Sequence, residues 1–369
     1  MKDIRKIFNL SIIGVAAVLM MSSCENYLEQ PVESITTVDS VFTNPDNAML
    51  ALWACYDDMM TLNVGLRYYE NGCHRRDQYF GNGVNSCWDH SYLFSDEATH
   101  EAMGWGVSGA MQKGSWDQFG QKDFPTLGHL KAIRTCNIFL ENAANVPLGA
   151  TANWNWDADY QKQVIAEARF LRAFLHFEIF RRYGGIPILN KLSTYEQIDQ
   201  GLLVDPSGER QSLESTIDFV VSECDKAAPD LPDSYSDAEK GRVNKGAALA
   251  LKAKALLYAA SPLYNTDTPP ISYGNELDSL LCYGNFDNNR WELARQAYKD
   301  AIDWAESNGY ELLDDPVEGK RQSYVIGTMA ARSQSPLNKE VIMSDRTMPP
   351  QVNPWRFYYA GCPILTAPW

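Results

Sequence analysis

Apolar residues recur every three or four positions along most of the chain, and this period predicts amphipathic helices rather than strands. Pro45, a residue favoured in the first helical turn, precedes a long helix that we expect over 46–60. The same period predicts five more helices, at 127–144, 159–183, 210–228, 244–260 and 289–308. Strand patterns are few. The intervening stretches are rich in Gly, Asn, Pro and aromatic residues, which predicts long loops at 62–126, 261–288 and 309–369.

The helix predicted at 159–183 has an apolar surface too wide for one neighbour. Its first stripe follows spacings of four, three, four and four and consists of Val164, Ala168, Leu171, Leu175 and Ile179. A second, adjacent stripe consists of Phe170, Phe174, Phe177 and Phe180. Glu178 and Arg182 form a favourable i,i+4 pair on the remaining surface. We therefore expect this helix to be packed on several sides, and to end at Gly184, Gly185 and Pro187.

Two later helices indicate how the helices stack. Asn244 is a good N-cap for the helix at 244–260, whose many alanines allow a partner helix to approach closely. Pro262 stops that helix from continuing. In the next helix, Trp291, Ala294 and Tyr298 fit the start of a tetratricopeptide (TPR) helix. The pattern predicts a mainly α fold of TPR-like stacked helical hairpins with long aromatic-rich loops.

The N-terminus has the charge, apolar and small-residue order of a bacterial export signal. Lys2, Arg5 and Lys6 precede the apolar run 7–21, which ends in two serines and Cys24. This ending, "MSSC", resembles a lipobox, in which the cysteine is acylated and becomes the first residue after cleavage. We expect residues 1–23 to be a lipoprotein signal peptide, Cys24 the lipid attachment site, 24–44 a spacer and 45–369 the folded domain. Two or more acyl chains hold a protein on a membrane durably.

Charge and cysteine content exclude some kinds of partner. The net charge is −15, which repels phosphate backbones, so we expect no nucleic-acid partner. Cys55, Cys136 and Cys224 lie in helical patterns and are expected to be buried, small apolar residues. The nearest approach to a zinc pattern is Cys73, His74, Cys87 and His90. Its spacing differs from that of zinc fingers and ribbons, so we expect no metal.

Catalytic motifs are missing or stand in the wrong context. "GWGVSG" at 104–109 matches a dinucleotide-binding pattern, but no buried strand precedes it. The sequence has no G-x-S-x-G, H-E-x-x-H or P-loop motif. Acidic pairs such as Asp57–Asp58 and Asp96–Glu97 keep a surface glycoside hydrolase as an alternative, although sequence adjacency does not give the required carboxylate separation. We expect no catalysis and no cofactor.

Two long segments resemble the SusD/RagB family of outer-membrane nutrient-binding lipoproteins. They are "AEARFLRAFLHFEIFRRYGGIPIL" at 166–189 and "GRVNKGAALALKAKALLYAASPLY" at 241–264. The resemblance implies a TPR-like scaffold with a loop-rich ligand face, anchored on the outer membrane and facing the exterior. It also implies a SusC-like TonB-dependent transporter as partner and a glycan as ligand, with peptide as the alternative cargo. Family members continue well beyond Trp369, so the C-terminal part is expected to be missing.

Aromatic residues mixed with Asn, Asp and Arg mark the expected ligand face, because rings stack on the C–H faces of sugars and polar groups bind their hydroxyls. The loop 74–94 has this mixture, and a second excursion follows the helix at 244–260 and holds Tyr264, Tyr283 and Phe286. By contrast, "WNWDADY" at 154–160 begins a helix and is expected to pack. The candidate ligand-binding residues are Arg75, Asp77, Tyr79, Asn85, Trp88, Asp89, Trp105, Trp116 and Tyr283.

Overall fold

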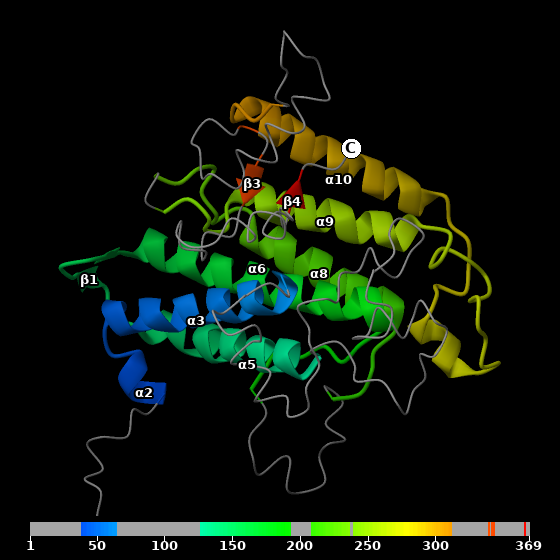
Figure 1. Cartoon of the computed structure of the whole chain (residues 1–369), viewed down its shortest axis with the longest axis horizontal. Helices are drawn as coiled ribbons and strands as arrows, with labels where there is room; N and C mark the ends of the chain where they lie inside the picture. Colours follow the sequence, from blue (N-terminus) through cyan, green and yellow to red (C-terminus); the bar gives the residue numbers. More distant parts are fainter. Residues whose placement is uncertain are drawn as a thin grey trace, which may run out of the picture. The chain divides into compact units, whose positions relative to one another are not determined.

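The computed structural model describes residues 38–64, 126–192, 208–236, 239–311, 339, 341–343 and 365–366. The chain divides into two units. In the first, Met1–Val41, the described element is the short helix α2 (Val38–Val41). The second, Phe42–Trp369, contains all the other elements and is built mainly of helices (Figure 1). The mainly α, TPR-like prediction is thus confirmed for this unit.

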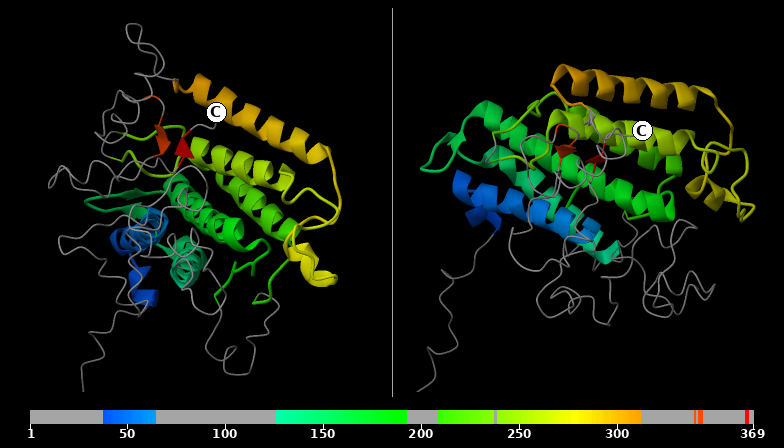
Figure 2. Two further views of the ribbon diagram at one scale, coloured as in Figure 1. Left: turned by 45° about the vertical axis from the view of Figure 1, so that its right-hand side comes forward. Right: turned by 45° about the horizontal axis from the view of Figure 1, so that its top comes forward.

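Six long helices agree with the predicted ones to within a few residues at each end. They are α3 (Pro45–Val64), α5 (Thr126–Asn142), α6 (Ala158–Tyr183), α8 (Leu213–Ala227), α9 (Lys245–Ala260) and α10 (Asn289–Ser307). Each packs against the next in this order, from α3 and α5 through α6 to α10. Figure 2 shows the resulting series of neighbouring helices, with α10 at its outer edge. This is the stacking that the alanine-rich and aromatic helix faces predict.

The middle of the series is α6, which contacts α3, α5, α8 and α9. Its apolar stripes are buried as expected, with Phe170, Leu171 and Phe177 fully withdrawn from solvent. Asp157 caps its first turn by accepting from the backbone N–H groups of Asp159 and Tyr160. Gly184 ends it at φ 73°, where a β-carbon would lie 2.2 Å from the carbonyl oxygen of Leu280.

The Glu178–Arg182 pair forms, but not on an exposed face. The Arg182 guanidinium lies 2.9 Å from the Glu178 carboxylate, and Glu178 is only 5% exposed. The i,i+4 spacing correctly predicts that Glu178 and Arg182 pair, but it does not predict that the pair is buried. Burial follows from the neighbouring helices, because α6 is covered on nearly all sides and leaves little surface for a solvated charge.

The predicted start of α9 is confirmed, since the Asn244 side chain accepts from the backbone N–H of Ala247 at 3.0 Å. Small residues let α10 approach α9 closely. The Trp304 ring of α10 lies over Gly246, where any β-carbon would clash with it. The indole N–H of Trp304 donates to Asp233 at 2.7 Å, which fixes the ring between the two helices.

Short elements were not predicted. The 3₁₀ turns are η4 (Ala143–Asn145) and η6 (Glu276–Leu280), and the strands are β1 (Gly149–Ala150), β2 (Asn155–Trp156), β3 (Val341–Met343) and β4 (Leu365–Thr366). β1 pairs antiparallel with β2, and β3 with β4. The prediction of loops throughout 309–369 is therefore wrong at β3 and β4. Strands of two or three residues are too short to show alternation in the sequence.

Other sequence expectations concern cysteines, metals and membrane spans. Cys55, Cys136 and Cys224 are buried, as predicted. Trp156 is fully buried, so the packing role of the 154–160 segment is also confirmed there. Within the described ranges, no helix has the length and apolar character to cross a bilayer. The same ranges hold no group of three His, Cys, Asp or Glu side chains arranged for a metal ion.

Candidate functional site

Most of the predicted ligand face falls outside the described residues. This applies to the lipid attachment site Cys24 and to eight of the candidate binding residues, namely Arg75, Asp77, Tyr79, Asn85, Trp88, Asp89, Trp105 and Trp116. These assignments stay predictions. The candidate that the structure describes is Tyr283, in the excursion 261–288 between α9 and α10.

The Tyr283 ring is half-buried and one of its faces is occupied. The guanidinium of Arg290 lies 3.7 Å from the ring centroid, which is close cation–π contact. Burial raises the pKa of the Tyr283 phenol well above its ordinary value, and the Arg290 charge opposes this rise. A ligand ring can therefore stack only on the face of Tyr283 that Arg290 leaves free.

Asn265 holds Arg290 and the end of the excursion in place. It is 2% exposed, and its side-chain oxygen accepts from Asp287 N at 2.8 Å and from the Arg290 guanidinium at 2.6 Å. Its side-chain amide donates to the Asp287 carbonyl at 2.9 Å. Arg290 also donates to the Asn285 side chain at 2.7 Å. The surroundings of Tyr283 are thus pre-arranged by hydrogen bonds, of which those made by Asn265 are partly buried.

Two other rings of the excursion face solvent. Tyr273 is 62% exposed and Phe286 is 61% exposed. Their backbones are fixed by carboxylates, since Asp278 accepts from Tyr273 N at 2.7 Å and Asp267 from Phe286 N at 3.0 Å. These rings are available to stack on a ligand. In the sequence, turn-forming Gly, Asn and Asp residues surround each of these two rings. This pattern indicates an aromatic residue on the surface of a loop.

Tyr264 differs from these rings. It is 7% exposed, and its ring lies 5.3 Å from that of Phe180 in α6. Tyr264 therefore packs against the helices, and the sequence-based grouping of Tyr264 with the exposed rings is wrong. The residue directly follows "AASPL", where the end of α9 turns back onto the scaffold.

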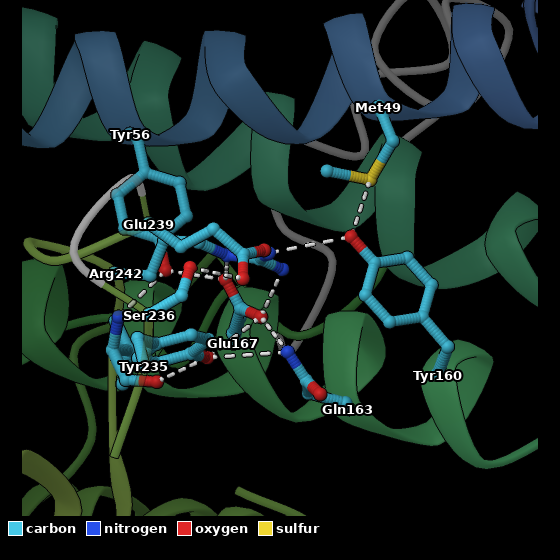
Figure 3. A network of polar contacts seen from close by, with 10 residues as sticks. Met49, Tyr56, Tyr160, Gln163, Glu167, Tyr235, Ser236, Glu239 and Arg242 are labelled. Carbon is cyan, nitrogen blue, oxygen red and sulfur yellow. Dashed lines mark hydrogen bonds and ion pairs between the residues drawn. The ribbon is translucent and has the colours of Figure 1, made fainter. Parts of the chain in front are cut away.

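A buried polar network joins α3, α6 and the segment that leads into α9, as Figure 3 shows. At its centre, Arg242 donates to both carboxylate oxygens of Glu167, at 2.6 and 3.1 Å. Arg242 also donates to Glu239 at 2.6 Å. The side chains of Arg242 and Glu167 are 3% and 0% exposed. This pair was not singled out from the sequence, although both residues lie in the family-like segments.

Tyrosines complete this network. The Tyr56 hydroxyl of α3 donates to Glu167 at 2.6 Å and accepts from Val243 N at 2.9 Å. Burial, followed by the Glu167 charge, raises the pKa of Tyr56 well above its ordinary value, so the phenol keeps its proton. Arg242 also lies 5.0 Å from the ring centroid of Tyr235. Every one of these groups has a partner within the network. We therefore infer that the network joins α3, α6 and the segment that leads into α9, and that it does not bind a ligand.

A second buried network crosses from α5 to α8 through α6. Arg172 pairs with Glu223 and donates to the Asn137 side chain at 2.8 Å. His176 bonds through Nδ1 to the Arg172 carbonyl at 2.8 Å and accepts at Nε2 from Leu189 N at 3.2 Å. Burial lowers the pKa of His176 to about 4, so the imidazole is neutral. These contacts position the chain after α6.

Comparisons with known proteins agree with this architecture. The SusD-like family described as "Starch-binding associating with outer membrane" matches residues 77–257. SusD-like protein P38 of Formosa agariphila is 26% identical over 257 residues, which cover 69% of this chain and 43% of that protein.

Solved structures show the same fold. A SusD-like protein from Bacteroides fragilis is 21% identical, with a TM-score of 0.50, 88% of this chain covered and 48% of that one. A laminarin-binding SusD-like protein is 16% identical, with a TM-score of 0.50, 82% of this chain covered and 51% of that one. The chain thus spans about half the length of these relatives.

Proposed function

Because the chain belongs to the SusD-like family of carbohydrate-binding proteins, we propose that it is an outer-membrane lipoprotein that binds an oligosaccharide at the cell surface. It delivers this ligand to a SusC-like TonB-dependent transporter. The anchor is an acyl group on Cys24, in keeping with the export signal that precedes it. The protein acts by binding alone, without a covalent step.

The observation that carries this proposal is the family match over 77–257. That range contains seven of the nine candidate ligand-binding residues, from Asp77 to Trp116. Binding rests on stacking of rings against the C–H faces of sugars and on hydrogen bonds from Asn, Asp and Arg.

The excursion 261–288 supplies a second part of the ligand face. Its exposed rings Tyr273 and Phe286 stand on a backbone fixed by Asp278 and Asp267, and the half-buried Tyr283 lies beside Arg290. Because the backbone that carries these two rings is fixed before binding, it loses little conformational freedom when a ligand arrives. Such rings suit a ligand with flat apolar faces and many hydroxyls.

A panel of oligosaccharides and short peptides, screened against the purified chain, tests the proposal. Laminarin belongs in the panel, because a protein of similar fold binds it. We expect saturable binding of at least one oligosaccharide and unchanged chain length of that sugar after incubation. Binding of peptides alone would replace the proposal with peptide uptake, and shortening of the sugar would indicate a glycoside hydrolase.

A further inference from the structure

Aromatic rings gather where the turn between β1 and β2 meets α3 and the start of α6. Trp154, in that turn, stacks on Tyr160 of α6 with ring centroids 6.0 Å apart and planes inclined by 19°. Trp53 of α3 lies 6.4 Å from Trp154, with the two planes inclined by 52°. Both tryptophans are partly exposed, whereas Trp156, which packs edge-on against Tyr160, is fully buried. Three elements thus place two indole rings together at the surface.

The backbone that carries Trp154 is fixed by a short hydrogen-bonded turn. Thr151 N donates to the Trp154 carbonyl at 2.7 Å, and Trp154 N donates to the Thr151 hydroxyl at 3.0 Å. The turn is tied to α3, because the Asp46 carboxylate accepts from the Thr151 hydroxyl at 3.2 Å and from the Asn153 side chain at 3.1 Å. The position of the Trp154 backbone is therefore set before any ligand arrives.

The Trp53 and Tyr160 rings are supported from within by Arg242. Its guanidinium lies 5.5 Å from the Trp53 centroid and 5.6 Å from the Tyr160 centroid, within cation–π range. Because Arg242 is itself paired with Glu167, this support is part of the buried network. A ligand can therefore reach the exposed parts of Trp53 and Trp154 while the network stays closed.

The hydrogen-bonding groups of this surface are only partly used. Toward the residues that the structure describes, the indole N–H groups of Trp53 and Trp154 donate no hydrogen bond. The side-chain oxygen of Asn153, an exposed residue, accepts none from them either. Leu50, one turn before Trp53 on α3, is 66% exposed. Apolar surfaces, two donors and an acceptor are thus open to solvent together.

The charges around the two rings favour a neutral ligand. Asp46 and Asp157 add negative charge, and Lys162 is already paired with Asp159 at 2.9 Å. The chain carries a net charge of −15, so an anion is repelled. A wholly apolar ligand would leave the indole and amide groups without partners. A neutral sugar meets both conditions, because it has C–H faces for the rings and hydroxyls for the polar groups.

We propose that Trp53 and Trp154 form a binding site for a neutral oligosaccharide, separate from the predicted ligand face. A sugar ring lies against the two indoles through its C–H face, and its hydroxyls bond to the indole N–H groups and to Asn153. The ligand class rests on the proposed function, but the site shares none of its residues.

The site lies at the opposite end of α6 from the excursion 261–288 (Figure 1). Asp157, which directly follows β2, caps the start of α6. Gly185, just past its end, donates to the Leu280 carbonyl of the excursion at 2.7 Å. A helix of 26 residues is about 39 Å long. A short oligosaccharide therefore binds at one end only, whereas a long glycan that reaches both ends is held at two points.

Heteronuclear NMR of the tryptophan indole groups tests the site, because each indole N–H reports its own surroundings. The whole chain is titrated with maltohexaose, cellohexaose and xylohexaose, and signals are assigned from single Trp→Phe variants. We expect the Trp53 and Trp154 signals to shift saturably with at least one of these sugars. The Trp304 signal should stay in place, because its N–H is bonded to Asp233 between α9 and α10.

Variants followed through the Trp53 signal give the contribution of Trp154. Trp154→Ala should weaken sugar binding by about tenfold or more. The matched control, Trp291→Ala, removes a 40% exposed tryptophan from α10 and should leave the affinity unchanged. If Trp154→Ala loses its native circular dichroism, Trp154→Phe takes its place. It keeps a ring on Tyr160 but lacks the N–H, and should weaken binding severalfold.

The same spectra separate this site from the proposed ligand face. Shifts of the Trp88 signal without shifts of Trp53 and Trp154 would overturn the site and leave the proposed function standing. Shifts of Trp53 and Trp154 alone would support the site and count against the loop 74–94. Unshifted Trp53 and Trp154 signals with all three sugars, or equal affinities of wild type and a folded Trp154 variant, would also overturn the proposal.

Discussion

The guanidinium of Arg242 and the carboxylate of Glu167 form a two-point ion pair in the interior, with contacts of 2.6 and 3.1 Å. The two residues are 75 positions apart in the sequence. Their pairing joins α6 to the segment that leads into α9, and Tyr56 adds α3 to the same network (Figure 3). The network therefore holds together three elements that lie far apart along the chain.

Removing Arg242 should destabilise the fold strongly. Arg242→Met leaves the Glu167 carboxylate buried without its counter-charge, at an expected cost of about 3–5 kcal/mol. Urea unfolding followed by circular dichroism measures this loss. A matched control is Lys162→Met, which breaks the exposed pair with Asp159 and should leave stability nearly unchanged.

A double variant tests whether the cost comes from the unpaired charge. Glu167→Gln together with Arg242→Met removes both charges, so its loss should be smaller than the sum of the two single losses. Strictly additive losses, or an Arg242→Met protein as stable as wild type, would show that the two side chains are not coupled as the structure indicates.

Acid should destabilise the protein through His176. The pKa of this buried imidazole is about 4 in the folded chain and 6.5 in the unfolded chain, so only the unfolded chain takes up the proton between these values. The contribution of His176 is complete above pH 6.5 and falls as the pH drops toward 4. The total loss is about 3 kcal/mol. Unfolding free energies measured from pH 7 to 4.5 give the size of the effect.

The control for this prediction is His176→Gln, which keeps a donor and an acceptor but does not titrate. Carboxylates such as Glu178 and Glu223 titrate in both proteins and cancel in the comparison. The stability of wild type should fall more steeply with acid than that of His176→Gln. Parallel curves over this range would mean that His176 is not held neutral in the folded protein.

The sequence predicted the long helices because their ends are marked by local residues. Pro45, Asn244 and Gly184 act within a single turn, so each boundary depends only on neighbouring positions. The buried pair of Arg242 and Glu167 could not be predicted in this way, since an isolated charge in a sequence indicates solvent exposure unless its partner is known. Only the packing of α6 against the start of α9 brings the two together.

The candidate site was predictable by region but less so by residue. Aromatic residues among Gly, Asn and Asp in 261–288 correctly indicated a loop that carries rings. Which rings face solvent depends on tertiary contacts, such as that of Tyr264 with Phe180 and that of Arg290 with Tyr283. Arg290 lies seven positions after Tyr283, and this spacing does not indicate in the sequence that the guanidinium covers the ring.

Lipid attachment at Cys24 should determine where the protein is found. Cys24→Ala removes the thiol that we propose to be acylated, so the protein should leave the membrane fraction while its helical content stays unchanged. Fractionation and circular dichroism measure the two properties. Mass spectrometry that finds an unmodified Cys24 in membrane-bound wild type would disprove the lipoprotein assignment.

Trp88 is the predicted platform of the loop 74–94, with Asp89 and Asn85 near it in the sequence. Trp88→Ala should weaken oligosaccharide binding by about 1–3 kcal/mol, the scale of a lost interface anchor, and leave the thermal midpoint nearly unchanged. A Trp88 that packs against the helices gives the opposite result, a lower midpoint with intact affinity. That outcome would move the ligand face toward Trp105, Trp116 and Tyr283.

The central claim, that this chain binds glycans without acting on them, is tested most directly by calorimetric titration of the folded chain with the strongest oligosaccharide of the panel. We expect a saturable isotherm with a negative heat-capacity change from ring burial, and recovery of the sugar at its original length. A chain with native helical circular dichroism that gives no saturable heat with any oligosaccharide, or that returns shortened sugar, would contradict the account.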